Sequence, residues 1–287
     1  MRKRYSLFNI VNTIFLGFVA LLTMFPFLIV LAVSFTDERS IAKNGFRLIP
    51  EKWSLNAYRL LFDGTVIFDA YKITTIVTVT GTVLSVLITS MMAYSLSRKN
   101  LKYRNVINMI VYIPMVFSGG LVPFYMVLLK LHLKDNILGL ILPILFNPFF
   151  MFLMLNSFRG VPDAVIESAK IDGAGEFKIY RSIAIYLALP GIATITLFYA
   201  LNYWNEWNLA LLLINEPKLY PLQYLLRMVL QRVTYVGQAA MTANVSEIPA
   251  ESTKMATVIV TIGPILLVYP FVQKYFIRGI TIGAIKG

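Results

Sequence analysis

The sequence predicts an all-α membrane protein that crosses the bilayer with six helices. Hydrophobic residues make up 58% of the 287-residue chain, against the roughly 45–50% apolar content of soluble domains, and the mean hydropathy is +0.72. Six apolar runs reach the length of about 20 residues that a helix needs to cross the hydrocarbon core. The basic residues lie in short clusters between these runs, as expected for loops of a polytopic protein.

The six apolar runs set the order of the predicted spans. They cover residues 10–35, 73–97, 105–129, 137–157, 185–213 and 255–276. The first run follows Arg2, Lys3 and Arg4, as in a signal peptide, but it is too long and lacks a small-x-small cleavage site. We therefore expect an uncleaved first span. No repeat or long linker interrupts the chain, so residues 1–287 are expected to form a single transmembrane domain.

Basic clusters predict the orientation. Six spans place both termini on one side of the membrane, and that side also carries the tight cluster of Arg98, Lys99, Lys102 and Arg104. Positive residues in short loops mark the cytoplasmic side. Both termini and the loop over 158–184 are therefore expected in the cytoplasm.

The second span indicates a packed bundle, because small residues recur at every fourth position. They are Gly81, Ser85, Thr89 and Ala93. Such a ridge lets another helix approach closely. Prolines lie within or at the ends of several spans. Each removes a backbone donor and favours a kink, and neighbouring helices or water must then bond the freed carbonyl groups. They are Pro114, Pro123, Pro143, Pro148, Pro264 and Pro270.

Two longer regions are expected on the opposite side of the membrane, and each contains a predicted surface helix. In residues 36–72, the sequence W-S-L-N-A-Y predicts a helix with Ser54 as its N-cap. In residues 214–254, the apolar positions from Leu222 to Leu230 share one helical face. This second helix would lie on the bilayer surface or dock a partner.

No enzyme active site or metal site is predicted. The chain has no cysteine, and its single histidine, His132, lies in a polar loop; a lone imidazole makes neither a metal site nor a proton relay. No G-x-x-x-x-G-K-[S/T] phosphate loop is present, so any ATP hydrolysis needs another subunit. The net charge of +12 follows no continuous basic face, which argues against nucleic-acid binding.

The loop over 158–184 is polar, lies between apolar runs and contains the sequence E-S-A-K-I-D-G-A. Residues 165–169 suit a short helix. The pair Asp172-Gly173 is expected to stop it, because glycine readily adopts positive φ. A second helix is expected over 174–185. A projecting helix–turn–helix can fit a groove on another protein; the alternative is an ordinary loop with helical flanks.

The fifth span carries the best candidates for a substrate path. On one helical face lie Tyr199, Asn202, Tyr203 and Glu206. A carboxylate inside a span faces a cavity or a partner, and aromatic and amide groups together suit sugars. The alternative is an interfacial aromatic belt, with Trp204 and Trp207 near the headgroups. Asn147 and Asn156 of the fourth span are secondary candidates, with helix–helix hydrogen bonding as the alternative.

The loop over 158–184 resembles the E-A-A…D-G-A…L-P signature of ABC importer permeases. The stretches F-S-G-G-L-V-P-F-Y, Y-P-L-Q, K-M-A-T and the ending G-A-I-K-G are also similar to carbohydrate-uptake permeases, in the branch related to maltose permeases. The resemblance implies the type I importer permease fold. It also implies an ATPase-coupling element formed by Glu167, Ser168, Ala169, Asp172, Gly173 and Ala174. Ser168 departs from the usual alanine.

The resemblance implies the partners as well. They are a homologous, non-identical permease, two ATPase subunits that bind ATP and Mg, and an external solute-binding protein that delivers an oligo- or polysaccharide. Lys286 and Gly287 would reach toward the ATPases. The chain itself would bind no cofactor, and it would lie in the inner membrane of a bacterium. The sequence leaves open whether the saccharide is acidic.

Two other functions compete with this one. An ion-coupled secondary sugar transporter is supported only by Glu206, whereas such carriers usually show several intramembrane ionisable groups and repeated halves. A membrane-embedded enzyme for lipid-linked sugars lacks the catalytic carboxylates or histidines that it would need.

Overall fold

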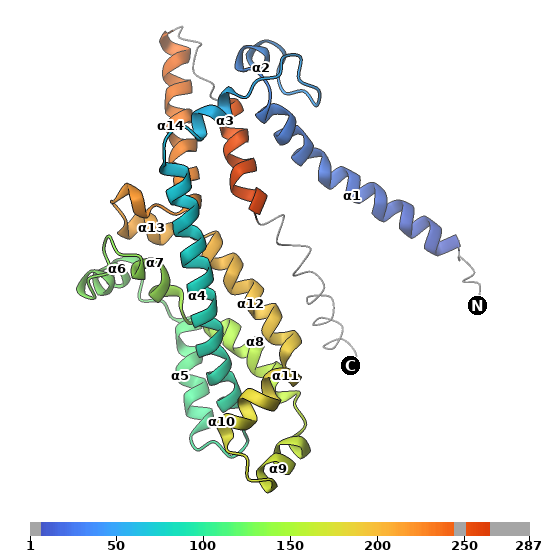
Figure 1. Cartoon of the computed structure of the whole chain (residues 1–287), viewed down its shortest axis with the longest axis vertical. Helices are drawn as coiled ribbons and strands as arrows, with labels where there is room; N and C mark the ends of the chain where they lie inside the picture. Colours follow the sequence, from blue (N-terminus) through green and yellow to red (C-terminus); the bar gives the residue numbers. More distant parts are fainter. Residues whose placement is uncertain (1–6, 244–250, 265–287) are drawn as a thin grey trace. The chain divides into compact units, whose positions relative to one another are not determined.

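The computed structural model describes residues 7–243 and 251–264. Over those residues the chain is helical apart from turns, loops and an isolated bridge between Thr36 and Trp53, which confirms the all-α class (Figure 1). The chain divides into two compact units: Met1–Ile67 with Leu225–Pro264, and Phe68–Tyr224 with Ile265–Gly287. The expectation of a single folding domain stays a prediction.

The first unit is made of two separate parts of the sequence, one near the start of the chain and one after residue 224. It contains α1 (Leu7–Ser34), α2 (Glu38–Asn44), α3 (Asn56–Leu61), most of α14 (Leu222–Ala243) and a helix over 251–264. The most apolar stretch of α1 has no buried residue. Helix α14 confirms the helix predicted after residue 222, and it continues well beyond Leu230.

The loop between α1 and α3 is held by polar contacts. Ser34 Oγ lies 2.8 Å from Tyr58 Oη, and the Asn56 backbone N–H donates to Ser54 Oγ at 3.2 Å. Leu55 occupies the N-cap position of α3, so the predicted N-cap at Ser54 was wrong, and the Ser54 hydroxyl accepts from the first residue of the helix instead.

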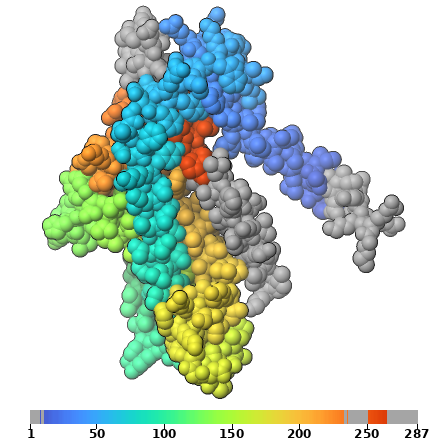
Figure 2. Space-filling model, in the orientation of Figure 1, coloured from blue at the N-terminus to red at the C-terminus, as the bar shows by residue number. Residues whose placement is uncertain are grey.

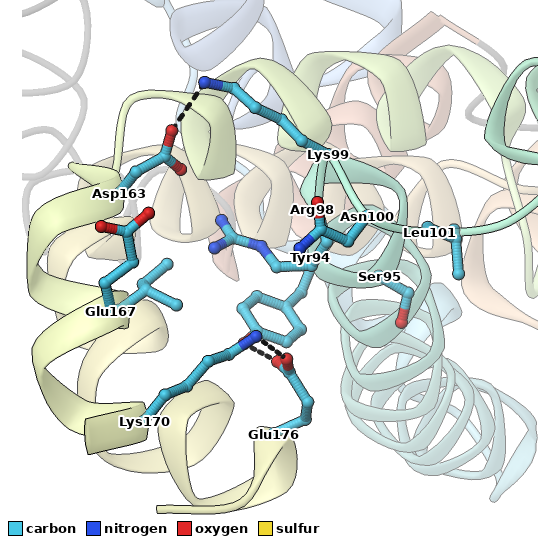
Figure 3. Close-up of a pocket in the computed structure, with 11 residues that line it drawn as sticks. Tyr94, Ser95, Arg98, Lys99, Asn100, Leu101, Asp163, Glu167, Lys170 and Glu176 are labelled. Carbon is cyan, nitrogen blue, oxygen red and sulfur yellow. Dashed lines mark hydrogen bonds and ion pairs between the residues drawn. The ribbon is translucent and has the colours of Figure 1, made fainter. Parts of the chain in front are cut away.

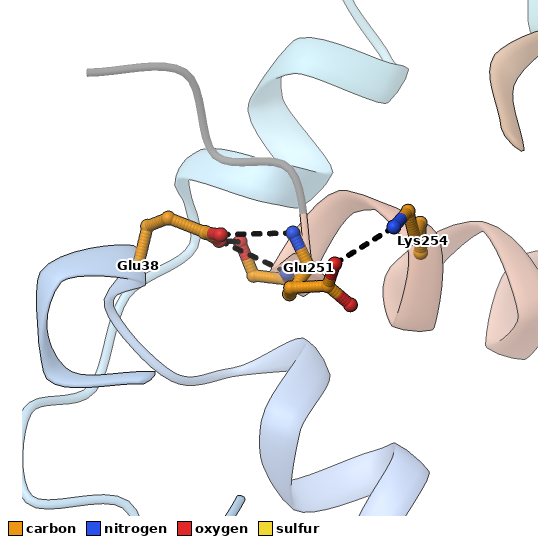
Figure 4. A network of polar contacts seen from close by, with 4 residues as sticks. Glu38, Glu251 and Lys254 are labelled. Carbon is orange, nitrogen blue, oxygen red and sulfur yellow. Dashed lines mark hydrogen bonds and ion pairs between the residues drawn. The ribbon is translucent and has the colours of Figure 1, made fainter. Parts of the chain in front are cut away.

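Glu38 of α2 caps the helix over 251–264 from a distant part of the sequence. Its carboxylate accepts from the Glu251 backbone N–H at 2.8 Å, and from the backbone N–H and hydroxyl of Ser252 at 3.0 and 2.7 Å (Figure 4). A carboxylate at a helix N-terminus satisfies donors that have no partner within the helix.

The second unit is built around the long helix α4. Its elements are most of α4 (Val66–Ser97), α5 (Arg104–Val116), α6 (Leu121–Lys130), α7 (Leu138–Ile141), η1 (Leu142–Ile144), α8 (Pro148–Arg159), α9 (Asp163–Ile171), α10 (Glu176–Ile179), η2 (Tyr180–Ala184), α11 (Ile185–Leu187), α12 (Leu189–Trp204), α13 (Asn208–Leu213) and η3 (Pro217–Leu219). Helices α8 and α12 pack closely on each other.

The small-residue ridge of α4 receives tyrosine rings. An added Cβ at Gly81 would lie 2.5 Å from the ring of Tyr203, so only glycine leaves room there. Ser85 Oγ and Tyr203 Oη are 3.0 Å apart, and Thr89 Oγ1 and Tyr199 Oη are 2.8 Å apart. The ridge thus provides close approach as predicted, and it adds buried hydrogen bonds.

The described residues contain two unbroken helices long and apolar enough to cross a membrane, within Val11–Ser34 and Val66–Ser97. Three bent pairs bring the number to five if each pair is one span: Arg104–Val116 with Leu121–Lys130 at 114°, Leu138–Ile144 with Pro148–Arg159 at 56°, and Glu176–Leu187 with Leu189–Trp204 at 84°. The predicted count of six is not confirmed, because the sixth run, 255–276, is described only to residue 264.

Three predicted spans are therefore broken rather than continuous. The sharpest break, between α5 and α6, follows from local geometry, since Phe117 is extended and Gly120 has φ 84°. In the fourth span, the break precedes Pro148, and Asn147 is the N-cap of α8. The fifth span was placed over 185–213, but α12 ends at Trp204.

Candidate functional site

The predicted ATPase-coupling loop folds as two short helices joined by a tight turn. Helix α9 ends with the Ala174 backbone N–H donating to the Ala169 carbonyl at 2.9 Å and the Gly173 backbone N–H donating to the Lys170 carbonyl at 3.0 Å. This pair of bonds is a Schellman motif, which needs a left-handed residue. Gly173 supplies it with φ 78°. The predicted turn is confirmed.

The helix limits differ from the prediction by a few residues. Helix α9 begins at Asp163 and ends at Ile171, and α10 begins at Glu176. Pro162 sits at the N-cap of α9 in an extended conformation, which stops the helix from beginning earlier. The second helix continues past Ile185 to Leu187 through a stretch of π-helix.

The six predicted coupling residues lie together on this loop, mostly at its surface. Glu167, Ser168, Asp172 and Gly173 are exposed, Ala174 is half-buried and Ala169 is buried. Ile171 is 86% exposed although it lies outside the candidate spans. Figure 2 shows this yellow-green segment open at the surface of the second unit. A partner that covered this side chain would remove apolar surface from water.

Two ion pairs flank a cavity of about 400 Å³ between the coupling loop and the end of α4. Lys99 Nζ lies 2.7 Å from Asp163 Oδ2, and Lys170 Nζ lies 2.5 Å from Glu176 Oε1 (Figure 3). Glu167 lines the same cavity and makes no ion pair within the described residues.

The Lys99 partner shifts the ionisation of Asp163. Its hydrogen bond, and then its charge, lower the pKa of Asp163 below the ordinary value of 3.8. A carboxyl with a lowered pKa stabilises the fold above its ordinary pKa, and this contribution is lost as the pH falls through the lowered value. The pair is therefore intact at neutral pH, with a small effect because both side chains are exposed.

The predicted substrate-path residues separate into different environments. Tyr199 and Tyr203 share a face of α12, as predicted, and are 0% and 2% exposed. Tyr199 Oη also accepts from the Asn147 backbone N–H at 3.0 Å, and Tyr203 Oη donates to the Ile141 carbonyl at 3.1 Å. In this conformation both rings are part of the packing against α4. A role in the path for them stays a prediction.

The other candidates differ in burial and in hydrogen bonding. Asn202 is half-buried and Asn156 is exposed. Glu206 follows the end of α12 instead of lying inside a span, and it accepts from the Asn208 and Leu209 backbone N–H groups at 2.7 and 2.9 Å. It therefore caps α13. Asn147 caps α8 by accepting from the backbone N–H groups of residues 149 and 150.

Sequence reasoning missed the contacts that fasten the loop to α4. Tyr94 Oη donates to Glu176 Oε2 at 2.8 Å, across 82 residues of sequence, and Lys99 and Asp163 are 64 residues apart. These residues are evident in the sequence, but no local sequence pattern indicates that they contact each other. The exposed apolar Ile171 could have been found, because it interrupts an otherwise polar stretch.

A family model and two relatives match this chain along most of its length. A family model described as "Binding-protein-dependent transport system inner membrane component" matches residues 81–282. The polygalacturonan/rhamnogalacturonan transport system permease protein of Bacillus subtilis (strain 168) is 39% identical over 287 residues, covering 98% of this chain and 99% of the relative. The arabinooligosaccharides transport system permease protein of the same organism is 28% identical, covering 99% and 98%.

A solved structure shows the same fold. It is a chain of a bacterial ABC transporter involved in the import of the acidic polysaccharide alginate. The TM-score is 0.82 and the identity is 29%, covering 96% of this chain and 99% of that one. The expected type I permease fold is thereby confirmed.

Proposed function

Because the chain belongs to the family of binding-protein-dependent transport system inner membrane components, we propose that it is the permease subunit of an ATP-driven importer for oligo- or polysaccharides. It forms half of the translocation path, and a homologous second permease forms the other half. Two ATPase subunits bind and hydrolyse ATP with Mg. A solute-binding protein delivers the saccharide on the outer side.

The single observation that carries the coupling role is the α9 hairpin. It presents a Schellman turn, a row of exposed polar residues and Ile171 at 86% exposure. Such a rigid, partly apolar projection fits a groove on a protein partner, since apolar surface outside the membrane is stabilised when a partner covers it. Glu167 makes a charged contact with the ATPase, and Gly173 keeps the turn in shape.

The proposed substrate class follows from the relatives. Two of them are permeases of transport systems for polygalacturonan/rhamnogalacturonan and for arabinooligosaccharides, and the solved transporter is involved in the import of alginate. The half-buried Asn202 has an amide that can bond a saccharide hydroxyl. We place the chain in the bacterial inner membrane with both termini and the loop over 158–184 in the cytoplasm.

The ion-coupled alternative loses its one support in this structure. Glu206 accepts two backbone hydrogen bonds at the start of α13. Capping explains the presence of a carboxylate at this position without proton or sodium transport.

Reconstitution tests the proposal. Proteoliposomes would hold both permeases and the ATPase subunits, with the solute-binding protein and labelled oligogalacturonate added on the outer side. We expect uptake that requires ATP and the ATPase on the inner side and is unaffected by collapsing the proton and sodium gradients. Uptake that persists without the ATPase and follows an ion gradient would establish the secondary transporter instead.

A further inference from the structure

The coupling loop is joined to α4, and to the turn that follows α4, by a buried apolar cluster and by a few polar side chains. Between α9 and the end of α4 lies the cavity of about 400 Å³. On α9, Ile166 and Ala169 are buried inward. Lys99, just after α4, pairs with Asp163 at the start of α9, and Lys170 pairs with Glu176 within the loop. Two bonds reach α4 itself, from Tyr94 to Glu176 at 2.8 Å and between Ser90 and Tyr180 at 2.7 Å.

Glu176 connects the end of α9 to a buried residue of α4. One carboxylate oxygen accepts from Lys170 Nζ at 2.5 Å, and the other accepts from Tyr94 Oη at 2.8 Å. Tyr94 is 5% exposed. Its ring packs on Phe158 and Tyr180 with centroid distances of 5.8 and 5.2 Å. One end of this bridge is therefore fixed in the core, and the other end lies on the exposed helix.

The same helix α4 carries the contacts to the predicted path. About one and a half turns before Tyr94, Thr89 bonds Tyr199 of α12, and Ser85 bonds Tyr203 one turn earlier still. Glu176, α4 and these hydroxyls therefore form a continuous series of contacts from the end of α9 to α12.

We propose that Glu176, with Lys170 and Tyr94, is a positioning site that transmits motion of the ATPase-bound hairpin to α4. The inference rests on the proposed function, because it needs an ATPase that moves α9. The carboxylate and ammonium groups are 53% and 44% exposed, and exposed ion pairs add little to stability. Losing the bridge should therefore leave folding intact and weaken transmission.

Matched variants test the bridge in the assembled importer. Glu176→Gln and Lys170→Gln should lower the saccharide transported per ATP hydrolysed by about 2- to 30-fold, the range of mutational effects on coupling between sites. Tyr94→Phe should act in the same direction. The control is Lys178→Gln, which removes the same charge from an exposed lysine of α10 without an ion pair in the described structure. Its ratio should match the wild type.

Charge exchange separates this role from direct contact between Lys170 and the ATPase. The double variant Lys170→Glu with Glu176→Lys restores the pair in reverse and should recover most of the lost ratio. A lysine that acts only on the ATPase would give no recovery, and that result would overturn the proposal.

A second measurement needs no transported substrate. Spin labels on Ser168→Cys and Asn100→Cys, in a chain without cysteine, report the distance between the hairpin and the end of α4 in the assembled complex. Glu176→Gln should broaden the distance distribution, and Lys178→Gln should leave it unchanged. An unchanged distribution in Glu176→Gln would reject the bridge. Broadening with no ATP-dependent saccharide uptake by the wild type would instead reject the proposed function.

Discussion

The residues on one face of α12 differ in the hydrogen bonds that they make within the protein. Tyr199 and Tyr203 use their hydroxyls on α4, so their exposure to a substrate would require α12 to move away from that helix. Asn202 is half-buried, and its side chain makes no hydrogen bond within the described part of the chain. An amide without a protein partner remains available to a ligand. Asn202 is therefore the residue of this face whose removal reports most cleanly on the path.

Asn202→Ala should lower the initial rate of saccharide uptake without changing assembly. Removal of one hydrogen bond to the saccharide is worth about 0.5–1.5 kcal/mol. Tyr203→Phe is the comparison. Loss of its two buried hydroxyl contacts should lower the free energy of unfolding by about 1–3 kcal/mol. Uptake rates and the yield of assembled complex separate the two effects. Normal uptake by Asn202→Ala would remove this residue from the path.

At the scale of elements, the contact between α4 and α12 depends on close approach at Gly81. Its Cβ position is 2.5 Å from two ring carbons of Tyr203, and that ring is held by Ser85 and by the Ile141 carbonyl. The ring cannot turn aside without breaking buried hydrogen bonds. The small-residue ridge is a general packing surface, and at Gly81 it also leaves the space that the ring of Tyr203 occupies.

Gly81→Ala should destabilise the protein by about 1–3 kcal/mol, the usual cost of adding a methyl to a filled core. The control is Gly17→Ala on α1, where nothing lies within 4 Å of the added Cβ and alanine favours the helix. Thermal unfolding in detergent measures both. Equal transition temperatures for Gly81→Ala and the wild type would contradict the packing described for α4.

For the whole molecule, features that depend on neighbouring residues in the sequence could be predicted. Features that depend on contacts between residues far apart in the sequence could not. The positive φ at Gly173 follows from an Asp-Gly pair after a helix, and the all-α class follows from the apolar runs. The 114° break between α5 and α6 depends on a short Ser-Gly-Gly segment inside one apolar run, which hydropathy does not register. The burial of Tyr199 depends on which helix faces it, and periodicity does not identify the neighbour.

The orientation of the whole chain is open to a direct labelling test. The chain has no cysteine, so single cysteines at Asn100, Gly175 and Asn44 give unambiguous signals. Asn100 and Gly175 are exposed and Asn44 is half-buried. In intact cells, an impermeant thiol reagent should label Asn44→Cys and spare the other two until the cells are opened. The opposite pattern would place the coupling loop outside the cytoplasm and remove its access to an ATPase.

We propose that the hairpin over 163–176 couples ATP hydrolysis in a partner to movement of the spans, and a substitution at Gly173 tests this role most directly. Gly173 has φ 78° with open space around its Cβ position, so a substitution there changes the turn through backbone strain alone. Valine at such a φ costs about 1–3 kcal/mol, whereas asparagine tolerates it.

The measurement is saccharide uptake per ATP hydrolysed in the reconstituted importer, for Gly173→Val, Gly173→Asn and the wild type. We predict that Gly173→Val assembles and hydrolyses ATP but loses uptake, and that Gly173→Asn keeps most of the wild-type ratio. A wild-type ratio in a normally assembled Gly173→Val importer would contradict the coupling role of the hairpin.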